Sequence, residues 1–256
     1  MRVASLSPAA TEILFAMGKG KDIVCTDQFS NFPDEAKAIP HLKDMIKIDP
    51  EAIRAFQPEV VLLGTSIQRK LAEQLKSDGF PVVFDDPRTM HAIYQWIRNL
   101  GLLLDCGKEA EALVLRIQQG LNDVKKKSAM MRRDARSVRL YIEEWHQPPF
   151  ASGNWVPEVA RIAGCTQFPV APGELSPEVT LEQVAAFDPE MIVISWCGAG
   201  HLADKNLLMN RPGWDVLRAV QTGKVRVIDD SLLNRPGPRL VDGAQHLYGW
   251  AFEMLH

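Results

Sequence analysis

The stretch that decides the fold reads IDPEAIRAFQPEVVLL at residues 48–63, and it recurs as VTLEQVAAFDPEMIVI at residues 179–194. The two copies align without a gap. Their identical pairs are Glu51 and Glu182, Ala55 and Ala186, Phe56 and Phe187, Pro58 and Pro189, and Glu59 and Glu190. A junction of this form can recur by chance, but the constant spacing favours an internal duplication. Because solenoids need three or more stacked repeats, two copies predict two lobes of one architecture.

Each copy predicts a short helix followed by a buried strand. The first helix should end before Pro58, because the residue that precedes a proline avoids the helical conformation. Residues 60–63 then form a continuous apolar run, which is typical of strands buried on both faces of a parallel sheet. The second copy predicts the same order, with a helix that ends at Phe187 and a strand over residues 191–194.

The remaining sequence continues this alternation in both halves. In the N-terminal half we predict strands at 3–6, 23–25, 60–63 and 82–84, and helices at 9–17, 49–56 and 67–77. In the C-terminal half we predict strands at 139–142, 191–194 and 225–228, helices at 154–163, 213–220 and 239–255, and a loop at 143–153. Strands that alternate with helices over short connections are typical of parallel α/β sheets.

Residues 89–131 show helical periodicity only, and a helix over about 108–130 would be roughly 35 Å long. Its central place favours a rod between two lobes over an ordinary surface helix. We therefore predict an α/β fold with two Rossmann-like lobes, mostly parallel sheets and one long backbone helix that joins them. The expected parts are an N-terminal lobe at 1–100, a linking helix at 101–135 and a C-terminal lobe at 136–256.

Composition excludes several classes of protein. The chain has 256 residues and a net charge of -3, and it carries no basic stripe long enough for nucleic-acid binding. Its four cysteines lie far apart and its histidines lack ligand spacing, so we predict no metal site and no required cofactor. No apolar run could insert into a membrane. The first strand leaves no room for a leader, so we expect a cytoplasmic protein as written, or a periplasmic or extracellular one if a leader was removed.

Aromatic side chains gather in the loops that follow the predicted strands. Ligands of open parallel sheets bind beyond the carboxyl ends of the strands, so these loops are the candidate binding surface. The aromatic residues there are Phe29, Phe32, Trp145, Phe150, Trp155 and Trp196. Each of them is as easily a packing residue as a ligand contact. Arg235 and Arg239 could reach an acidic or amide-bearing group of a ligand.

Catalytic patterns are weak. Glu143 and Glu144 are adjacent, so on a strand they would point to opposite faces and could not act as an acid–base pair. Ser152 and Gly153 lack a nucleophile elbow, and no phosphate-binding glycine loop is present. His146 is the one histidine that we expect to border a cleft. The sequence therefore predicts a protein that is not an enzyme.

The chain resembles the cobalamin-binding receptors of bacterial ABC importers, which are substrate-binding proteins with a helical backbone. The likeness lies in RVASLSPAATE at 2–12, SNFP at 30–33, the two duplicated junctions, PPFASG at 148–153, and Pro238 with Arg239. The opening and PPFASG are the parts most specific to the cobalamin branch. The junctions are shared with siderophore, haem and metal receptors.

The resemblance implies that two lobes hold a ligand in the cleft between them, with little closure. It also implies that one surface glutamate on each lobe, Glu51 and Glu182, docks on arginines of the membrane permease. A first-turn acid favoured by the helix dipole is the other interpretation of both residues. The expected ligand-binding residues are Ser7, Phe29, Gly64, Trp145, Phe150, Trp155, Trp196 and Arg235.

This chain departs from the family pattern in its cleft. Aromatic residues of the family fall at Gly64, at Ser176 and near Leu232, whereas Trp145 and Trp196 are added here. We expect a non-catalytic solute-binding protein that holds a cobalamin-like corrinoid in the inter-lobe cleft for an ABC importer. One alternative is a binder of an iron-siderophore, haem or another chelate. Another is a cytoplasmic corrinoid-related protein or enzyme that reuses the fold, with Glu144, Trp145 and His146 as its first candidates.

Overall fold

Two separate sheets organise the chain, each in a lobe of its own. A computed structural model describes residues 1–131 and 136–256. The N-terminal lobe comprises residues 1–87 and 91–116, and the C-terminal lobe comprises residues 88–90 and 117–256. The long helix α5 (Gly107–Met131) has residues in both lobes, because the division falls inside it. The last four residues of the predicted linking segment, 132–135, lie outside the described residues. The predicted fold class is confirmed.

The N-terminal sheet has five parallel strands in the order β3-β2-β1-β4-β5. They are β1 (Val3–Ser5), β2 (Ile23–Asp27), β3 (His41–Leu42), β4 (Val60–Gly64) and β5 (Val82–Asp85). The helices of this lobe are α1 (Pro8–Ala16), α2 (Pro50–Arg54), α3 (Arg69–Ser77) and α4 (Met90–Leu103). Single-turn helices lie at Gly20–Asp22, Asp34–Ala38 and Ser66–Gln68. All four predicted strands are confirmed, and β3 was missed because two residues carry no pattern.

The first copy of the duplicated junction forms the centre of this lobe. Every residue of β4 is buried, as expected for a strand covered on both faces. Ile53 of α2 is also fully buried, and it joins Leu63 and Leu75 in one apolar cluster. Burial of each such side chain stabilises the fold by about 1.5–3 kcal/mol. The cluster therefore fixes α2 and the end of β4 relative to each other.

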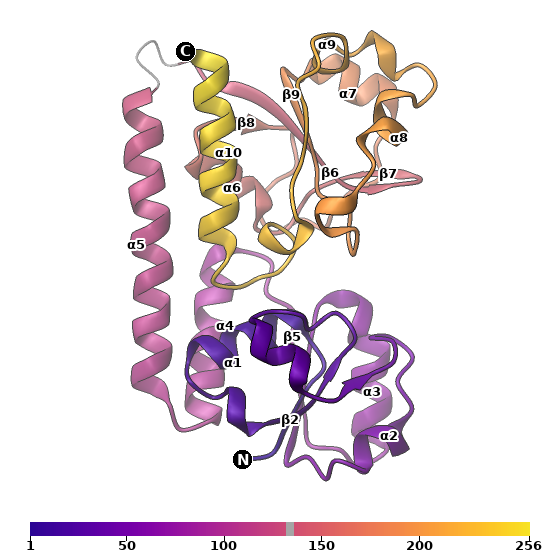
Figure 1. Ribbon diagram of the computed structural model, residues 1–256, viewed down its shortest axis with the longest axis vertical. Helices are drawn as coiled ribbons and strands as arrows, with labels where there is room; N and C mark the ends of the chain where they lie inside the picture. The colour runs from indigo at the N-terminus through magenta and orange to yellow at the C-terminus, as the bar shows by residue number, and fades with distance from the viewer. Residues whose placement is uncertain (132–135) are drawn as a thin grey trace. The chain divides into compact units, whose positions relative to one another are not determined.

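The C-terminal sheet follows the order β10-β9-β6-β7, with β8 paired to β6. Its strands are β6 (Val138–His146), β7 (Pro149–Ala151), β8 (Cys165–Gln167), β9 (Met191–Ile194) and β10 (Val225–Val227). All pairings are parallel except the antiparallel pair β6 and β7. The helices are α6 (Val156–Ile162), α7 (Leu181–Phe187), α8 (Lys205–Met209), α9 (Arg218–Gln221) and α10 (Leu240–Leu255), with single turns at Gly200–Leu202, Trp214–Val216 and Asp230–Leu232. Within this lobe, α10 packs along α6 (Figure 1).

Two predictions for this lobe were wrong. The predicted loop at 143–153 is mostly a hairpin, because β6 continues to His146 and Trp145 pairs with Phe150 of β7 across the turn. The predicted helix at 213–220 is a single turn followed by the short helix α9. Gly213 stands before that turn with φ of 80°, a left-handed conformation that glycine adopts readily. The other predicted strands and helices are present within a few residues of their expected bounds.

The duplicated glutamates Glu59 and Glu190 make matching contacts. The Arg2 N–H donates to Oε2 of Glu59 at 2.6 Å, and the Arg139 N–H donates to Oε2 of Glu190 at 3.1 Å. In return, each glutamate N–H donates to the carbonyl of the same arginine at 2.8 Å. Each carboxylate thus connects the start of one central strand to the start of its neighbour, β1 to β4 in one lobe and β6 to β9 in the other. The shared structural role explains why both copies of the junction carry a glutamate at this position.

The residues that precede Pro58 and Pro189 also share the same backbone conformation. Gln57 has φ of 45° and Asp188 has φ of 51°, so both are left-handed. The Arg2 side chain donates to the carbonyl of Gln57, and Nε of Arg139 donates to the carbonyl of Asp188 at 2.7 Å. An arginine from the neighbouring strand therefore stabilises the same tight turn in each lobe. The shared detail supports the duplication.

We expect Glu190→Gln to destabilise the C-terminal lobe more than Glu59→Gln destabilises the N-terminal lobe. Burial raises the pKa of Glu190, but the N–H of Arg139 and the guanidinium of Arg136 outweigh it and hold that pKa below its usual value. Loss of the charge should lower the free energy of unfolding by about 1 kcal/mol at neutral pH. The side chain of Glu59 is 61% exposed, so its loss should matter less.

The effect of Glu190→Gln should depend on pH. A carboxyl whose pKa is depressed by folding contributes stability above its unfolded pKa, and this stability is lost as the pH falls through the folded pKa. Denaturant unfolding of both variants at neutral and acidic pH measures this. The gap between wild type and Glu190→Gln should close in acid. A gap that is the same at both pH values contradicts the assignment.

Candidate ligand-binding site

Both sheets place polar and aromatic side chains at the carboxyl ends of their strands. In the N-terminal lobe, these positions hold Ser7 after β1, Phe29 after β2 and Thr65 after β4. In the C-terminal lobe, they hold His146 at the end of β6 and Trp196 after β9. Ligands of parallel sheets bind at these edges, so each lobe has a candidate surface there.

Ser7 and Gly64 lie against each other in the N-terminal lobe. Ser7 is buried and caps α1, with its Oγ accepting from the N–H of Ala10 at 3.5 Å. A Cβ on Gly64 would lie 3.3 Å from both Ser7 Oγ and the carbonyl oxygen of Asp85. Glycine at position 64 therefore permits a close approach to Ser7 and to the backbone of β5. The role of Ser7 in this structure is to cap helix α1.

A chain of buried hydroxyls lies behind Phe29. Oγ of Ser30 donates to Asp27 Oδ2 at 2.7 Å, and the N–H of Phe29 donates to Asp27 Oδ1 at 2.7 Å. Thr11 Oγ1 lies within hydrogen-bond distance of the hydroxyls of Ser30 and Ser5, at 3.0 and 2.8 Å. These contacts fix the backbone that presents the half-buried ring of Phe29.

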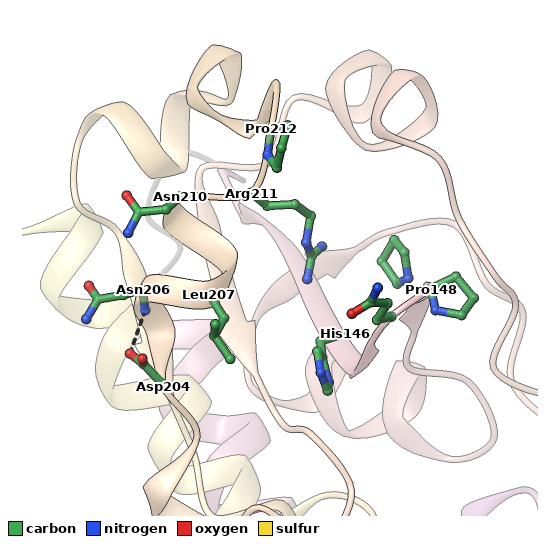
Figure 2. Close-up of a pocket in the computed structure, with 10 residues that line it drawn as sticks. His146, Pro148, Asp204, Asn206, Leu207, Asn210, Arg211 and Pro212 are labelled. Carbon is green, nitrogen blue, oxygen red and sulfur yellow. Dashed lines mark hydrogen bonds between the residues drawn. The ribbon is translucent and has the colours of Figure 1, made fainter.

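A pocket of about 580 Å³ opens in the C-terminal lobe, between the β6–β7 hairpin and the segment around α8. Its size is within the usual range for small-molecule sites. The lining residues are His146, Gln147, Pro148, Pro149, Asp204, Asn206, Leu207, Asn210, Arg211 and Pro212. Figure 2 shows the Arg211 side chain extending between the α8 wall and the hairpin wall. Prolines and amides dominate this lining.

A buried ion pair supports the floor of this pocket. Glu143 is fully buried, and Arg211 donates to both of its carboxylate oxygens, at 2.8 and 2.7 Å. The indole N–H of Trp196 and the hydroxyl of Tyr141 also donate to Glu143, at 2.9 and 3.0 Å. The guanidinium carbon of Arg211 lies 4.1 Å above the ring of Trp214. Because Glu143 neutralises Arg211, the pocket offers guanidinium donors without a net positive charge.

Three aromatic rings follow one another beside the pocket. The His146 ring lies 5.2 Å from the ring of Trp145 and 4.7 Å from that of Trp196, measured between centroids. Trp145 is 42% exposed, whereas Trp196 is only 4% exposed. Nδ1 of His146 is buried and has no hydrogen-bond partner among the described residues. Trp145 can therefore offer a ring face to a ligand, and Trp196 mainly supports His146.

The other expected ligand-binding residues of this lobe differ in accessibility. Trp155 is buried, and its indole N–H donates to the carbonyl oxygen of Leu233 at 2.7 Å. Phe150 is half-buried in β7, opposite Trp145. Arg235 is half-buried. Burial raises the pKa of Asp229, but the hydrogen bonds from Ser231 and the charges of Arg239 and Arg235 outweigh it and hold that pKa below its usual value. Trp155 thus links the start of α6 to the segment around Leu233 through a buried hydrogen bond.

Glu143 and Glu144 have separate partners. Glu143 is ion-paired to Arg211, whereas Glu144 accepts a hydrogen bond from Oγ of Ser176 at 2.7 Å. Burial raises the pKa of Glu144, and the Ser176 hydroxyl opposes this shift. Each carboxyl is therefore held in its own hydrogen-bond network. Ser176 therefore holds the side chain of Glu144, which lies on β6.

Glu51 and Glu182 occupy the same place in their helices. Each is the second residue of a capped helix, α2 or α7, and each is exposed. Arg54 donates to Glu51 at 3.1 Å. The Thr180 hydroxyl and the N-terminal backbone of α7 hold the pKa of Glu182 below its usual range. Both positions present a carboxylate to the surface of their own lobe.

Over residues 1–131 and 136–256, no group of three or more histidine, cysteine or acidic side chains is arranged to hold a metal ion. Among the helices described in the same ranges, none has the length and apolarity needed to cross a bilayer.

The model of one protein family, described as periplasmic binding protein, matches residues 3–232. The match covers both lobes and both copies of the duplicated junction. The chain belongs to the periplasmic binding protein family.

Relatives of this periplasmic binding protein span nearly its whole length. A vitamin B12-binding protein of Pectobacterium carotovorum is 28% identical over 96% of this chain and 86% of its own. An uncharacterized ABC transporter substrate-binding lipoprotein of Bacillus subtilis, YvrC, is 25% identical over 96% of this chain and 78% of its own. A periplasmic heme binding protein from Pseudomonas aeruginosa has a TM-score of 0.86 at 23% identity, over 98% of this chain and 92% of the other. The family is that of the solute-binding proteins of ABC importers.

The sequence of this periplasmic binding protein did not predict the part of the pocket that surrounds α8. Asn206, Leu207, Asn210 and Arg211 lie on a short helix and the turn after it, which have no clear periodicity. The Arg-Pro-Gly turn at 211–213 is the signal that could have located it, since such turns often carry exposed functional side chains. His146 lines this pocket of the C-terminal lobe, and its expected place at a cleft between the lobes stays a prediction.

Proposed function

We propose that this chain binds a corrinoid of the cobalamin type and delivers it to an ABC importer. The observation that carries the proposal is the 28% identity to a vitamin B12-binding protein over 96% of the chain. The role is binding without chemistry: the ligand is held, released and left unchanged.

The charges of the C-terminal pocket support a ligand without negative charge. Arg211 is paired with Glu143, Asp204 adds an acidic side chain to the lining, and the amides of Gln147, Asn206 and Asn210 also line it. Amides both donate and accept hydrogen bonds, so they match the carboxamide side chains on the periphery of cobalamin. Guanidinium donors held by Glu143 suit carbonyl oxygens of the same groups.

The apolar part of the surface supports a bulky ligand. The exposed ring of Trp145 lies beside His146, and Pro148, Pro149 and Leu207 line the adjoining pocket. Aromatic rings and prolines give large contact areas with little loss of side-chain entropy. They would pack against the faces and edges of a macrocycle, while the amides bind its polar rim.

The second candidate ligand is haem or another anionic chelate such as an iron-siderophore. It is favoured by the likeness in fold to a heme binding protein. Carboxylate-bearing chelates call for cations that are available to the ligand. Among the described residues that line the C-terminal pocket, the guanidinium of Arg211 is already bound to Glu143. For this reason we rank the corrinoid first.

We also propose that Glu51 and Glu182 contact the permease. Each carboxylate is exposed near the N-terminus of a helix whose own N–H groups are partly satisfied by a cap. A carboxylate there can form charge-assisted hydrogen bonds with an arginine of a partner. One such contact on each lobe would match the duplicated design of the chain.

Absorbance titration with cyanocobalamin tests the proposed ligand. The wild-type chain should saturate with it and should bind hemin and ferrichrome more weakly. No binding of cyanocobalamin at high micromolar concentration rejects the corrinoid. Tighter binding of hemin or ferrichrome favours the second candidate instead.

In the same titration, Trp145→Ala should weaken cyanocobalamin binding by about tenfold, because a solvent-exposed indole beside the pocket loses its stacking area. Phe252→Ala is the matched control, since Phe252 is a similarly exposed ring, at 44%, on α10. Equal effects of the two substitutions contradict a contact between Trp145 and the ligand.

A further inference from the structure

Thr65, the first residue after β4, has a backbone conformation that its side chain disfavours. Its φ is 80° and its ψ is 147°. Positive φ is uncommon for any residue other than glycine, and for a β-branched residue it is a genuine outlier. Gly64, which could adopt positive φ at no cost, directly precedes it and lies in the strand. The strain therefore falls on the residue least suited to it.

The hydroxyl of Thr65 adds a second unfavourable feature. Its Oγ1 is buried and has no hydrogen-bond partner among the described residues. Buried hydroxyls are nearly always bonded, because an unpaired one loses its hydration without compensation. Ser7, whose hydroxyl is also buried at this edge, does have a partner in Ala10. One residue thus combines backbone strain with an unsatisfied polar group.

A buried glutamine holds Thr65 in this conformation. Gln68 is fully buried, and its Oε1 accepts from the N–H of Gly64 at 2.9 Å. Its Nε2 donates to the carbonyls of Leu6 and Met45, at 2.6 and 2.9 Å. The N–H of Thr65 itself donates to the carbonyl of Asp85 at 3.3 Å. Strain persists only where the surroundings over-determine it, and the Gln68 contacts supply that constraint.

The position of Thr65 is where a parallel sheet binds its ligand. It follows the carboxyl end of β4, which lies between β1 and β5 in the sheet. Sites of strain gather at ligand contacts, because a pre-formed but unsatisfied group is completed when the ligand binds. From these observations we infer that the Thr65 hydroxyl hydrogen-bonds the transported ligand. This inference rests on the proposed function as a ligand-binding protein and adds a contact to it.

The chemistry around Thr65 selects a neutral polar group. A hydroxyl donates one hydrogen bond and accepts others without charge, which suits a carboxamide. A carboxylate on the ligand would instead call for a cation to pair with. The contact therefore favours a carboxamide-bearing corrinoid over carboxylate-bearing chelates.

Substitutions of Thr65 separate the hydroxyl from the backbone strain. Thr65→Val keeps the shape and removes the hydroxyl, whereas Thr65→Ser keeps the hydroxyl. Thr65→Gly removes the hydroxyl and relieves the positive φ. Thr222→Val is the control, because Thr222 is an exposed threonine whose hydroxyl already donates to Arg218. Each chain is titrated with cyanocobalamin, and its thermal midpoint is measured without ligand.

We expect Thr65→Val and Thr65→Gly to bind cyanocobalamin about tenfold more weakly, and Thr65→Ser to bind as the wild type does. Without ligand, Thr65→Val and Thr65→Gly should melt a few degrees higher, since each removes an unfavourable feature. Unchanged affinity of Thr65→Val overturns the inference. So does a lower midpoint of Thr65→Val, which would show that the hydroxyl has a structural partner in solution.

The proposed function can fail separately from this inference. If the wild type binds hemin or ferrichrome in place of cyanocobalamin, the corrinoid is rejected, and the same variants titrated with that probe decide the role of Thr65. If the wild type binds none of the three, the melting midpoints decide. Higher midpoints of Thr65→Val and Thr65→Gly than of the wild type support a hydroxyl that lacks a partner until a ligand binds. Lower midpoints reject this inference.

Discussion

Arg211→Met should destabilise the C-terminal lobe by about 3–5 kcal/mol, because it leaves the buried carboxylate of Glu143 without its cation. Glu143 is fully buried, and the two donors that would remain, from Trp196 and Tyr141, carry no charge. Methionine can still cover the ring of Trp214, so the loss measures the ion pair more than the packing. Urea unfolding followed by circular dichroism measures the change.

Two further variants show whether the charge is the cause. Arg218→Met is the matched control, because Arg218 pairs with Asp188 while both side chains are about half exposed, and this change should cost under about 1 kcal/mol. Adding Glu143→Gln to Arg211→Met should recover much of the stability, since the amide carries no charge while its oxygen can still accept from Trp196 or Tyr141. If the double variant is no more stable than Arg211→Met, the stranded charge is not the reason for the loss.

The duplicated junction could be predicted because its signals are local. Pro58 and Pro189 disfavour the helical conformation in the residue before each of them, and the apolar runs after them are typical of buried strands. The same holds for Ser7 and Pro8, which start α1 as expected. Local signals of this kind made it possible to predict most of the strands and the long helix α5.

The hairpin and the pocket could not be predicted in this way, because they depend on partners distant in sequence. Trp145 and Phe150 become strand residues by pairing with each other, and nothing local shows it. Trp196 and Trp155 looked like loop aromatics available to a ligand. Their burial follows from the acceptors that their indole N–H groups find, at Glu143 and at the carbonyl of Leu233. The sequence offers no sign of either acceptor.

Reversing the charges of Glu51 and Glu182 together, as Glu51→Lys and Glu182→Lys, should abolish uptake by the cognate importer while ligand affinity stays unchanged. Truncating one partner of a charge pair at an interface costs about 2–5 kcal/mol, so two reversals should lower delivery by about 100-fold or more. Both residues are exposed on the first turn of a helix, and neither belongs to the core of its lobe. Uptake into proteoliposomes that contain the importer, with cyanocobalamin titration alongside, measures both quantities.

The single variants should differ in size. Arg54 lies 3.1 Å from Glu51 and partly neutralises it, whereas Glu182 has no arginine or lysine within ion-pair distance among the described residues. We therefore expect Glu182→Lys to reduce uptake more than Glu51→Lys does. Glu73→Lys and Glu253→Lys, which reverse exposed acids elsewhere on the two lobes, control for net charge and should leave uptake unchanged. Normal uptake by the double variant, or a loss of ligand affinity in it, removes Glu51 and Glu182 from the docking surface.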